Sequence, residues 1–230
     1  MSKSRGNVTD PSEIAARYGV DAYRYFLLRE TPFGSDGTFS EEALILRYNT
    51  DLANDLGNLL HRTLTMCEKY FNRSIPIVLW PKKLSERDDI DIAIQRGYAS
   101  LRARVSSLLT KEIAEHMKEL EFEKALTAIW TLISQSNKFI EESAPWKLAK
   151  EARTDELKIV IVSLMEVLKA VSQAVWPFMP STAEEIWIQL GLSGKPNELP
   201  FKMNMWGFFD KDGKIAKGQP LFPRIETEKV

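Results

Sequence analysis

Residues 41–72 read EEALILRYNTDLANDLGNLLHRTLTMCEKYFN, and this stretch decides the fold class. Its apolar residues recur at gaps of mostly three and four, which places them on one face of a helix. Ser40 is expected to cap the first turn, where Glu41 and Glu42 suit the positive end of the helix dipole. The pattern predicts one continuous helix of about eight to nine turns. Its apolar stripe consists of Ile45, Tyr48, Leu52, Leu56, Leu59, Leu60, Leu64, Cys67 and Phe71.

A polar ridge runs along another face of the same helix. Asn54, Asn58 and Arg62 are four residues apart, so their side chains stack one above the next. Exposed amides and guanidinium groups usually serve only to solvate a surface. The same groups also match the donor and acceptor patterns of nucleic-acid bases, which favours recognition of a single strand. This helix alone leaves both interpretations open.

The composition excludes several kinds of protein. With 230 residues, 44% of them hydrophobic, the chain is long enough for one large domain or a domain with an appendage. Its 31 basic and 32 acidic residues exclude a protein that grips duplex DNA by overall charge, so any nucleic-acid contact must be a local patch. A single cysteine, Cys67, rules out a disulfide framework within the chain. With only two histidines, far apart, and no cysteine cluster, we expect no metal site.

Nothing in the sequence points to a membrane or to secretion. No apolar run reaches the roughly 18 residues of a membrane span. The first residues, MSKSRGN, lack the apolar core of a signal peptide. We therefore expect a cytoplasmic, soluble protein without membrane or DNA partners.

Helical periodicity continues beyond the first long helix. Apolar stripes predict helices over residues 90–119, 121–143, 155–175 and 182–190, and two shorter helices precede the long one, over residues 10–18 and 20–29. The first short helix has Asp10 as its cap and ends at Gly19. Residues 72–89 and 191–230 are predicted to be irregular, and Ile77, Val78, Leu79 and Trp80 of the first segment are expected to pack on the helices. The fold class is therefore predicted to be all-α.

Two further side chains stand out beside these helices. Asn137 lies next to the stripe of residues 121–143, where a buried, hydrogen-bonded asparagine is the favoured interpretation. Pro145 must break that helix, which leaves Trp146 at the start of the next one. A tryptophan there is either an anchor in the core or a platform on which an unstacked base lies.

The first residues carry a motif. In MSKSRGNV, Lys3 and Arg5 alternate with Ser2 and Ser4, a combination of charge and hydroxyl donors that suits a phosphate. The segment resembles the KMSKS signature of class I aminoacyl-tRNA synthetases, with the leading lysine missing. In that family the loop closes over ATP, and its second lysine stabilises pyrophosphate during amino-acid adenylation. The resemblance assigns that role to Lys3 and ATP contacts to Ser2, Lys3 and Ser4.

Further segments narrow the resemblance. Asn58 and Arg62, the SAPW segment at residues 143–146 and LFPRIE at 221–226 resemble methionyl-tRNA synthetases across essentially the whole chain. The resemblance implies a KMSKS loop and stem-contact segment over residues 1–40. It implies a helical anticodon-binding bundle over 41–191 and a tail that packs back over 192–230. It also implies that Asn58 and Arg62 hydrogen-bond the bases of a CAU anticodon, on which Trp146 stacks, with tRNA(Met) as partner.

The resemblance does not extend to the catalytic domain. The Rossmann domain with its HIGH signature, the methionine pocket and any zinc knuckle are absent from these 230 residues. We therefore expect that this chain alone does not form methionyl-adenylate, that it holds no cofactor by itself, and that ATP and Mg²⁺ act only in the full ligase with a catalytic domain as partner. The alternatives are a stand-alone helical interaction module and the same region of a leucyl, isoleucyl, valyl or cysteinyl enzyme.

Overall fold

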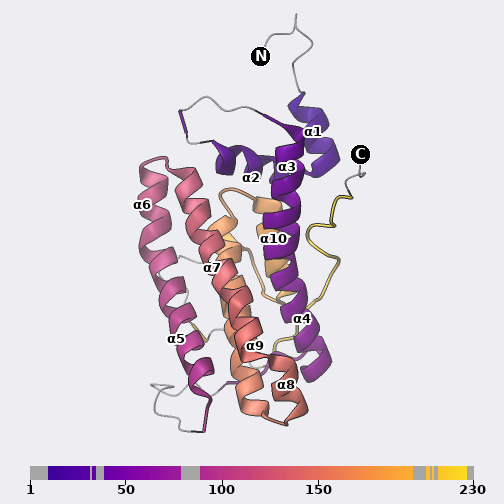
Figure 1. Ribbon diagram of the computed structural model, residues 1–230, viewed down its shortest axis with the longest axis vertical. Coiled ribbons are helices and arrows are strands. Elements are labelled where there is room, and N and C mark those ends of the chain that lie inside the picture. The colour runs from indigo at the N-terminus through magenta and orange to yellow at the C-terminus, as the bar shows by residue number, and fades with distance from the viewer. Residues whose placement is uncertain are drawn as a thin grey trace, which may run out of the picture.

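The computed structural model describes residues 10–31, 33–34, 39–78, 89–198, 206–207, 209 and 212–226. The described part of the chain is an elongated bundle of helices without a β-strand, as predicted (Figure 1). Ser74 and Lys214 form one isolated antiparallel bridge. The all-α prediction is confirmed.

The N-terminal helices follow their sequence signals closely. Helix α1 spans Pro11–Tyr18, and the Asp10 carboxylate accepts a hydrogen bond from the Ser12 amide at 2.8 Å, as a capping residue should. Gly19 has a φ of 89°, a conformation that favours glycine, and it separates α1 from α2, Val20–Glu30. Residues 31–39 lie partly outside the described ranges.

The long helix predicted over residues 41–72 is continuous but not uniform. Helix α3, Glu41–Arg47, leads directly into a π-helical stretch, η2, Tyr48–Gly57, and then into α4, Asn58–Phe71. The Ser40 hydroxyl caps α3 by accepting from the Ala43 amide at 3.3 Å. From residue 48 to residue 67 the predicted apolar stripe is buried. At its start the prediction was wrong by one position, because Leu44 is buried in place of the half-buried Ile45.

Three further helices form the middle of the chain. The helix predicted over 90–119 consists of α5, Ile92–Ser107, a short π-helical turn, η4, Leu108–Glu112, and α6, Ile113–Lys118. It packs beside α7, Phe122–Ser143, which matches its prediction within one residue. Ala144, in the left-handed region at a φ of 42°, ends α7 and leads into α8, Pro145–Lys150.

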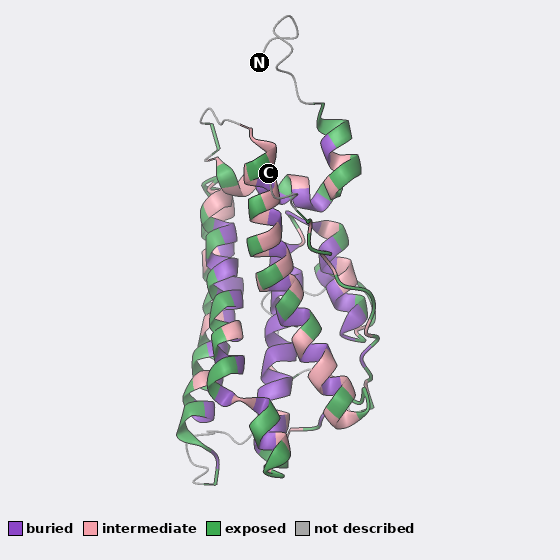
Figure 2. Cartoon of the chain, turned by 45° about the vertical axis from the view of Figure 1, so that its right-hand side comes forward, coloured by how far each residue is buried: buried purple, intermediate pink, exposed green. Residues whose placement is uncertain are grey.

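Helix α9, Thr154–Val175, is the centre of the bundle. It packs against α4, α5, α7, α8 and α10 and is buried on almost every side (Figure 2). Such all-round burial requires a sequence that is apolar around the whole helix, which VIVSLMEVLKAV largely is. Helix α10, Pro180–Gln189, begins two residues before its predicted start, because Pro180 suits the first turn of a helix.

Two irregular segments complete the structure. Before the undescribed residues 79–88, Ile75 and Pro76 are buried and Val78 packs on the core, whereas Ile77 is exposed, against its prediction. The predictions for Leu79 and Trp80 lie outside the described residues. A three-residue helical turn, Pro196–Glu198, follows α10.

The C-terminal tail returns along the bundle to the end that carries α1 (Figure 1). Ile215 is buried, and the Asn49 side chain of η2 bonds both backbone groups of Ile225 at 2.9 Å. The tail is thereby attached to the start of the long helix.

Candidate nucleic-acid interface

Asn58 and Arg62 lie on the outer side of α4, as the polar ridge predicted. The neighbouring residues Leu59, Leu60 and Thr63 face the core, and this burial fixes the rotation of the helix. Asn58 is exposed, and the side chain of Arg62 is 28% exposed. Both side chains are therefore placed to contact a molecule outside the bundle.

Trp146 also faces outward. The turn at Ala144 starts α8 with Pro145, and α8 buries Pro145 and Leu148, so the two residues between them, Trp146 and Lys147, project away from the core. Trp146 is 43% exposed, which is unusual for so large an aromatic side chain. This exposure excludes the core anchor, one of the two interpretations that the sequence left open.

An ion pair joins the two regions. Arg62 Nη1 lies 2.6 Å from Oε1 of Glu141, in the last turn of α7 and five residues before Trp146. The structure thus brings α4 and the α7–α8 turn together at the end of the bundle away from α1 (Figure 1). We call Asn58, Arg62, Glu141 and Trp146 the reader face, after the role that the resemblance implies for Asn58, Arg62 and Trp146.

Glu141 could not be predicted as a partner of Arg62 from the sequence. Its carboxylate pairs with the Arg62 guanidinium, which would otherwise be available to a ligand. The two residues lie far apart in the chain. Only the packing of α4 against α7 places the two side chains together. An acidic residue near the end of an amphipathic helix is too common to mark such a pair.

Basic side chains border the reader face. Lys147 and Lys150 lie on the exposed side of α8, and Lys138 on α7 pairs with Glu142 at 3.4 Å. Within the described residues, Lys147 and Lys150 have no ion-pair partner closer than 4.0 Å. Lys147 and Lys150 are therefore two exposed cations next to Trp146, whereas Lys138 and Arg62 are paired with the exposed Glu142 and Glu141.

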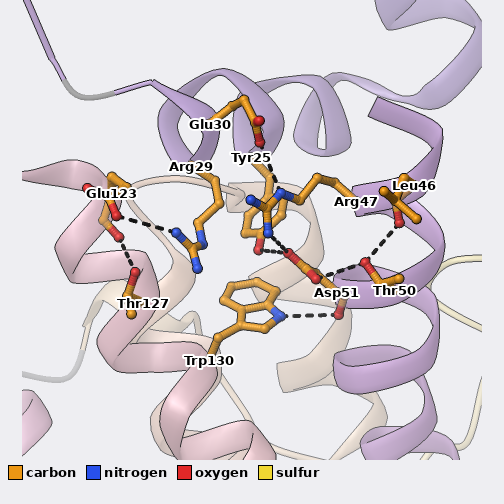
Figure 3. A network of polar contacts seen from close by, with 10 residues as sticks. All are labelled: Tyr25, Arg29, Glu30, Leu46, Arg47, Thr50, Asp51, Glu123, Thr127 and Trp130. Atoms are coloured by element: carbon orange, nitrogen blue, oxygen red, sulfur yellow. Dashed lines mark hydrogen bonds and ion pairs between the residues drawn. The ribbon is translucent and has the colours of Figure 1, made fainter. Parts of the chain in front are cut away.

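A buried polar junction supports the helix that carries this face (Figure 3). The Tyr25 hydroxyl of α2 donates to Asp51 Oδ2 of η2 at 2.8 Å, and Arg47 Nη1 lies 3.3 Å from the same oxygen. The Trp130 indole of α7 donates to the Asp51 carbonyl oxygen at 3.2 Å. Burial, followed by the charge of Asp51, raises the pKa of Tyr25 well above its usual value, so its hydroxyl remains a donor. The junction ties α2, η2 and α7 together.

Other predicted features have simpler outcomes. Ser2, Lys3 and Ser4, predicted to contact ATP, lie outside the described residues. Asn137 is partly buried and its Nδ2 donates to the Asp55 carbonyl oxygen at 3.2 Å, which confirms the predicted hydrogen bond. Asn54, the third member of the ridge, is exposed in η2.

Neither a metal cluster nor a membrane helix is found in the described part of the chain. No group of three or more acidic, histidine or cysteine side chains there is placed to hold a metal ion. Within the same ranges, no helix combines the length and the apolar character that crossing a lipid bilayer requires.

Two family models match the sequence. Residues 1–64 match tRNA synthetases class I (M), and residues 102–208 match the anticodon-binding domain of tRNA ligase. The second match includes Glu141 and Trp146, and the first includes Asn58 and Arg62. The two halves of the reader face therefore fall in two separately recognised regions.

Curated relatives and solved structures agree with these matches. The methionine–tRNA ligase of Caldanaerobacter subterraneus subsp. tengcongensis is 45% identical over 230 residues, all of this chain and 34% of that protein. The methionine–tRNA ligase of Halalkalibacterium halodurans is 43% identical over 99% of this chain and 33% of that protein. The Mycobacterium tuberculosis methionyl-tRNA synthetase in complex with methionyl-adenylate superimposes with a TM-score of 0.83 at 35% identity, over 97% of this chain and 41% of that one. The chain thus belongs to the methionyl-tRNA synthetase family and spans about a third of the length of its curated relatives.

Proposed function

We propose that this chain is the tRNA-recognition part of a methionine–tRNA ligase and that it reads the CAU anticodon of tRNA(Met). The observation that carries the proposal is the exposed Trp146 at the start of α8, five residues beyond the Glu141 that pairs with Arg62. An exposed aromatic surface suits an unstacked base better than it suits duplex nucleic acid.

Each residue of the reader face has a distinct part in the proposal. Trp146 provides a surface on which one base stacks, and the Asn58 amide and the Arg62 guanidinium donate hydrogen bonds to base edges. Arg62 must exchange Glu141 for the base. That exchange costs little, because an exposed ion pair is worth about 0–1 kcal/mol. Lys147 and Lys150 then contact the phosphates of the loop.

Stem-loop binding tests this assignment. The purified chain is titrated with an anticodon stem-loop carrying CAU, and with the same stem-loop carrying one changed base, at a single salt concentration. Trp146→Ala should weaken binding about 5- to 150-fold, the equivalent of about 1–3 kcal/mol for one stacked base. Asn58→Ala and Arg62→Ala should reduce the preference for CAU. Ile188→Ala is the matched control, because Ile188 is an apolar residue of α10 that is 55% exposed.

The outcomes separate the alternatives. Equal binding of both stem-loops by the unaltered chain would refute the reading of CAU and would leave an interaction module as the better description. A loss of affinity for Ile188→Ala as large as that for Trp146→Ala would remove the special role of Trp146.

We further propose that the adenylation step belongs to the complete ligase. The relatives are about three times as long as this chain, and Ser2, Lys3 and Ser4 would supply only the contacts of one loop to ATP and its Mg²⁺. The 230 residues should therefore show no exchange of pyrophosphate into ATP in the presence of methionine. Measurable exchange would overturn this proposal.

A further inference from the structure

Asn58 and Arg62 of the reader face follow directly after the π-helical stretch η2. In a π-helix each N–H bonds the carbonyl five residues earlier, so such a stretch holds more residues per turn than an α-helix. The backbone N–H of Asn58 shows this pattern, since it donates to the Ala53 carbonyl oxygen as well as to that of Asp55. Each residue inserted in this way turns all later side chains by about 100° around the helix axis. The π-helical register therefore decides where Asn58 and Arg62 point.

Two donors from α7 hold this stretch from the side. Asn137 Nδ2 donates to the Asp55 carbonyl oxygen, and Trp130 Nε1 donates to the Asp51 carbonyl oxygen, both at 3.2 Å. Asn137 and Trp130 are seven residues apart, which puts them on one face of α7 about two turns from each other. Figure 3 shows the Trp130 contact. The π-helical stretch is thus bonded to α7 at two of its own carbonyl groups.

The Asn137 contact reaches the reader residues through one shared atom. The Asp55 carbonyl oxygen accepts from Asn137 and also from the backbone amide of Asn58. Among the described residues, Asn137 Oδ1 is buried and has no hydrogen-bond partner. The Asn137 side chain therefore uses its N–H donor but not its oxygen acceptor. A buried acceptor without a partner is unfavourable for stability, so an asparagine at this position calls for another reason.

We propose that Asn137 is a positioning residue for anticodon reading, which holds the π-helical register before Asn58 and so aims Asn58 and Arg62 at the bases. The inference rests on the proposed function of the reader face. Asn137 itself touches no base in this scheme. It acts through the Asp55 carbonyl, with Trp130 as a second support at Asp51.

The test compares Asn137→Ala with Thr131→Ala in the full chain. Thr131 is exposed on the same helix, and within the described residues its hydroxyl donates only to the Thr127 carbonyl oxygen of that helix, so it is the matched control. The first measurement is hydrogen exchange of the backbone amide of Asn58, with the backbone amide of Leu64 as an internal reference. The second is the ratio of affinities for the CAU stem-loop and its one-base variant. Asn137→Gln, which retains the amide donor on a longer side chain, tests rescue.

Asn137→Ala should speed exchange at Asn58 by tenfold or more, leave Leu64 unchanged, and reduce the CAU preference by about tenfold while binding of the variant stem-loop persists. Asn137→Gln should restore part of the preference. If Asn137→Ala does not fold, Trp130→Phe removes the other donor and takes its place. Unchanged exchange at Asn58, or a preference equal to that of Thr131→Ala, would overturn the inference.

Failure of the proposed function would look different. The unaltered chain would then show no preference for CAU, whatever the exchange of the Asn58 amide. Faster exchange in Asn137→Ala would in that case retain the structural part of the inference, control of the register, and refute its part in reading bases.

Discussion

Replacing Tyr25 with phenylalanine should destabilise the junction between α2 and the bundle without altering its packing. The Tyr25 side chain is fully buried, and its only hydrogen bond in the described structure is the 2.8 Å donation to Asp51. Phenylalanine keeps the ring, whose centroid lies 4.4 Å from that of Trp130. The substitution therefore removes one hydroxyl group and little else.

The expected cost follows from the charge of the acceptor. A hydrogen bond to an ionised group contributes about 1.5–3 kcal/mol. Asp51 retains Arg47 at 3.3 Å and the Thr50 hydroxyl at 2.9 Å, so its charge stays partly compensated and the lower half of that range is expected. With an m-value of about 2 kcal/mol per molar urea, the unfolding midpoint should fall by about 1 M.

Urea unfolding followed by circular dichroism measures this difference. The matched control is Tyr23→Phe, because Tyr23 lies on the same helix and its hydroxyl has no hydrogen-bond partner in the described part of the chain. The control should shift the midpoint by less than about 0.3 M. Equal shifts for the two variants would refute the argument, since the hydroxyl contact with Asp51 would then contribute nothing.

Two more predictions concern buried groups. Burial raises the pKa of the Cys67 thiol to about 11, so Cys67 should not react with a thiol reagent at pH 8 until the chain is unfolded in urea. As pH rises from about 9 to about 11, the unfolded thiol ionises first, and stability should fall by about 1.4 kcal/mol per pH unit. Native reaction at the rate of a free thiol would contradict this. Lys169 Nζ lies 2.6 Å from Glu166 Oε2, with both side chains buried, so Lys169→Met should cost about 3–5 kcal/mol in thermal or urea unfolding. Adding Glu166→Met should recover part of that loss, and an unchanged stability of the single variant would refute the reasoning.

Periodicity predicted most of the helices because burial of one face is a local property of the sequence. Residues 121–143 and 155–175 match α7 and α9 within one residue at each end. The same reasoning missed η2, since apolar residues three and four apart fit both an α-helix and a slightly wider one. Trp130 and Asn137 of α7 donate to carbonyl oxygens of this stretch, and such distant partners leave no mark in the local pattern.

The residues of the reader face were likewise predicted from the sequence only in part. The spacing of Asn58 and Arg62 predicted that they share a face, and both do lie on the outer side of α4. For Trp146 the sequence allowed a core position or an exposed one, because the direction of a side chain after a proline break depends on the turn. The positive φ of Ala144 settled that choice, and neither this angle nor the Glu141 contact could be read from the sequence.

The return of the C-terminal tail determines how the protein can be attached to a surface. Because Asn49 holds Ile225 beside the start of the long helix, the described chain both begins, at Asp10 before α1, and ends, at Glu226, toward the end that carries α1 (Figure 1). Trp146, on α8, lies at the opposite end of the bundle, in which α9 with its 22 residues is about 33 Å long. A linker that follows Glu226 or precedes Asp10 would thus start from the far end of the bundle from Trp146, and attachment through it would leave α8 open to the solution.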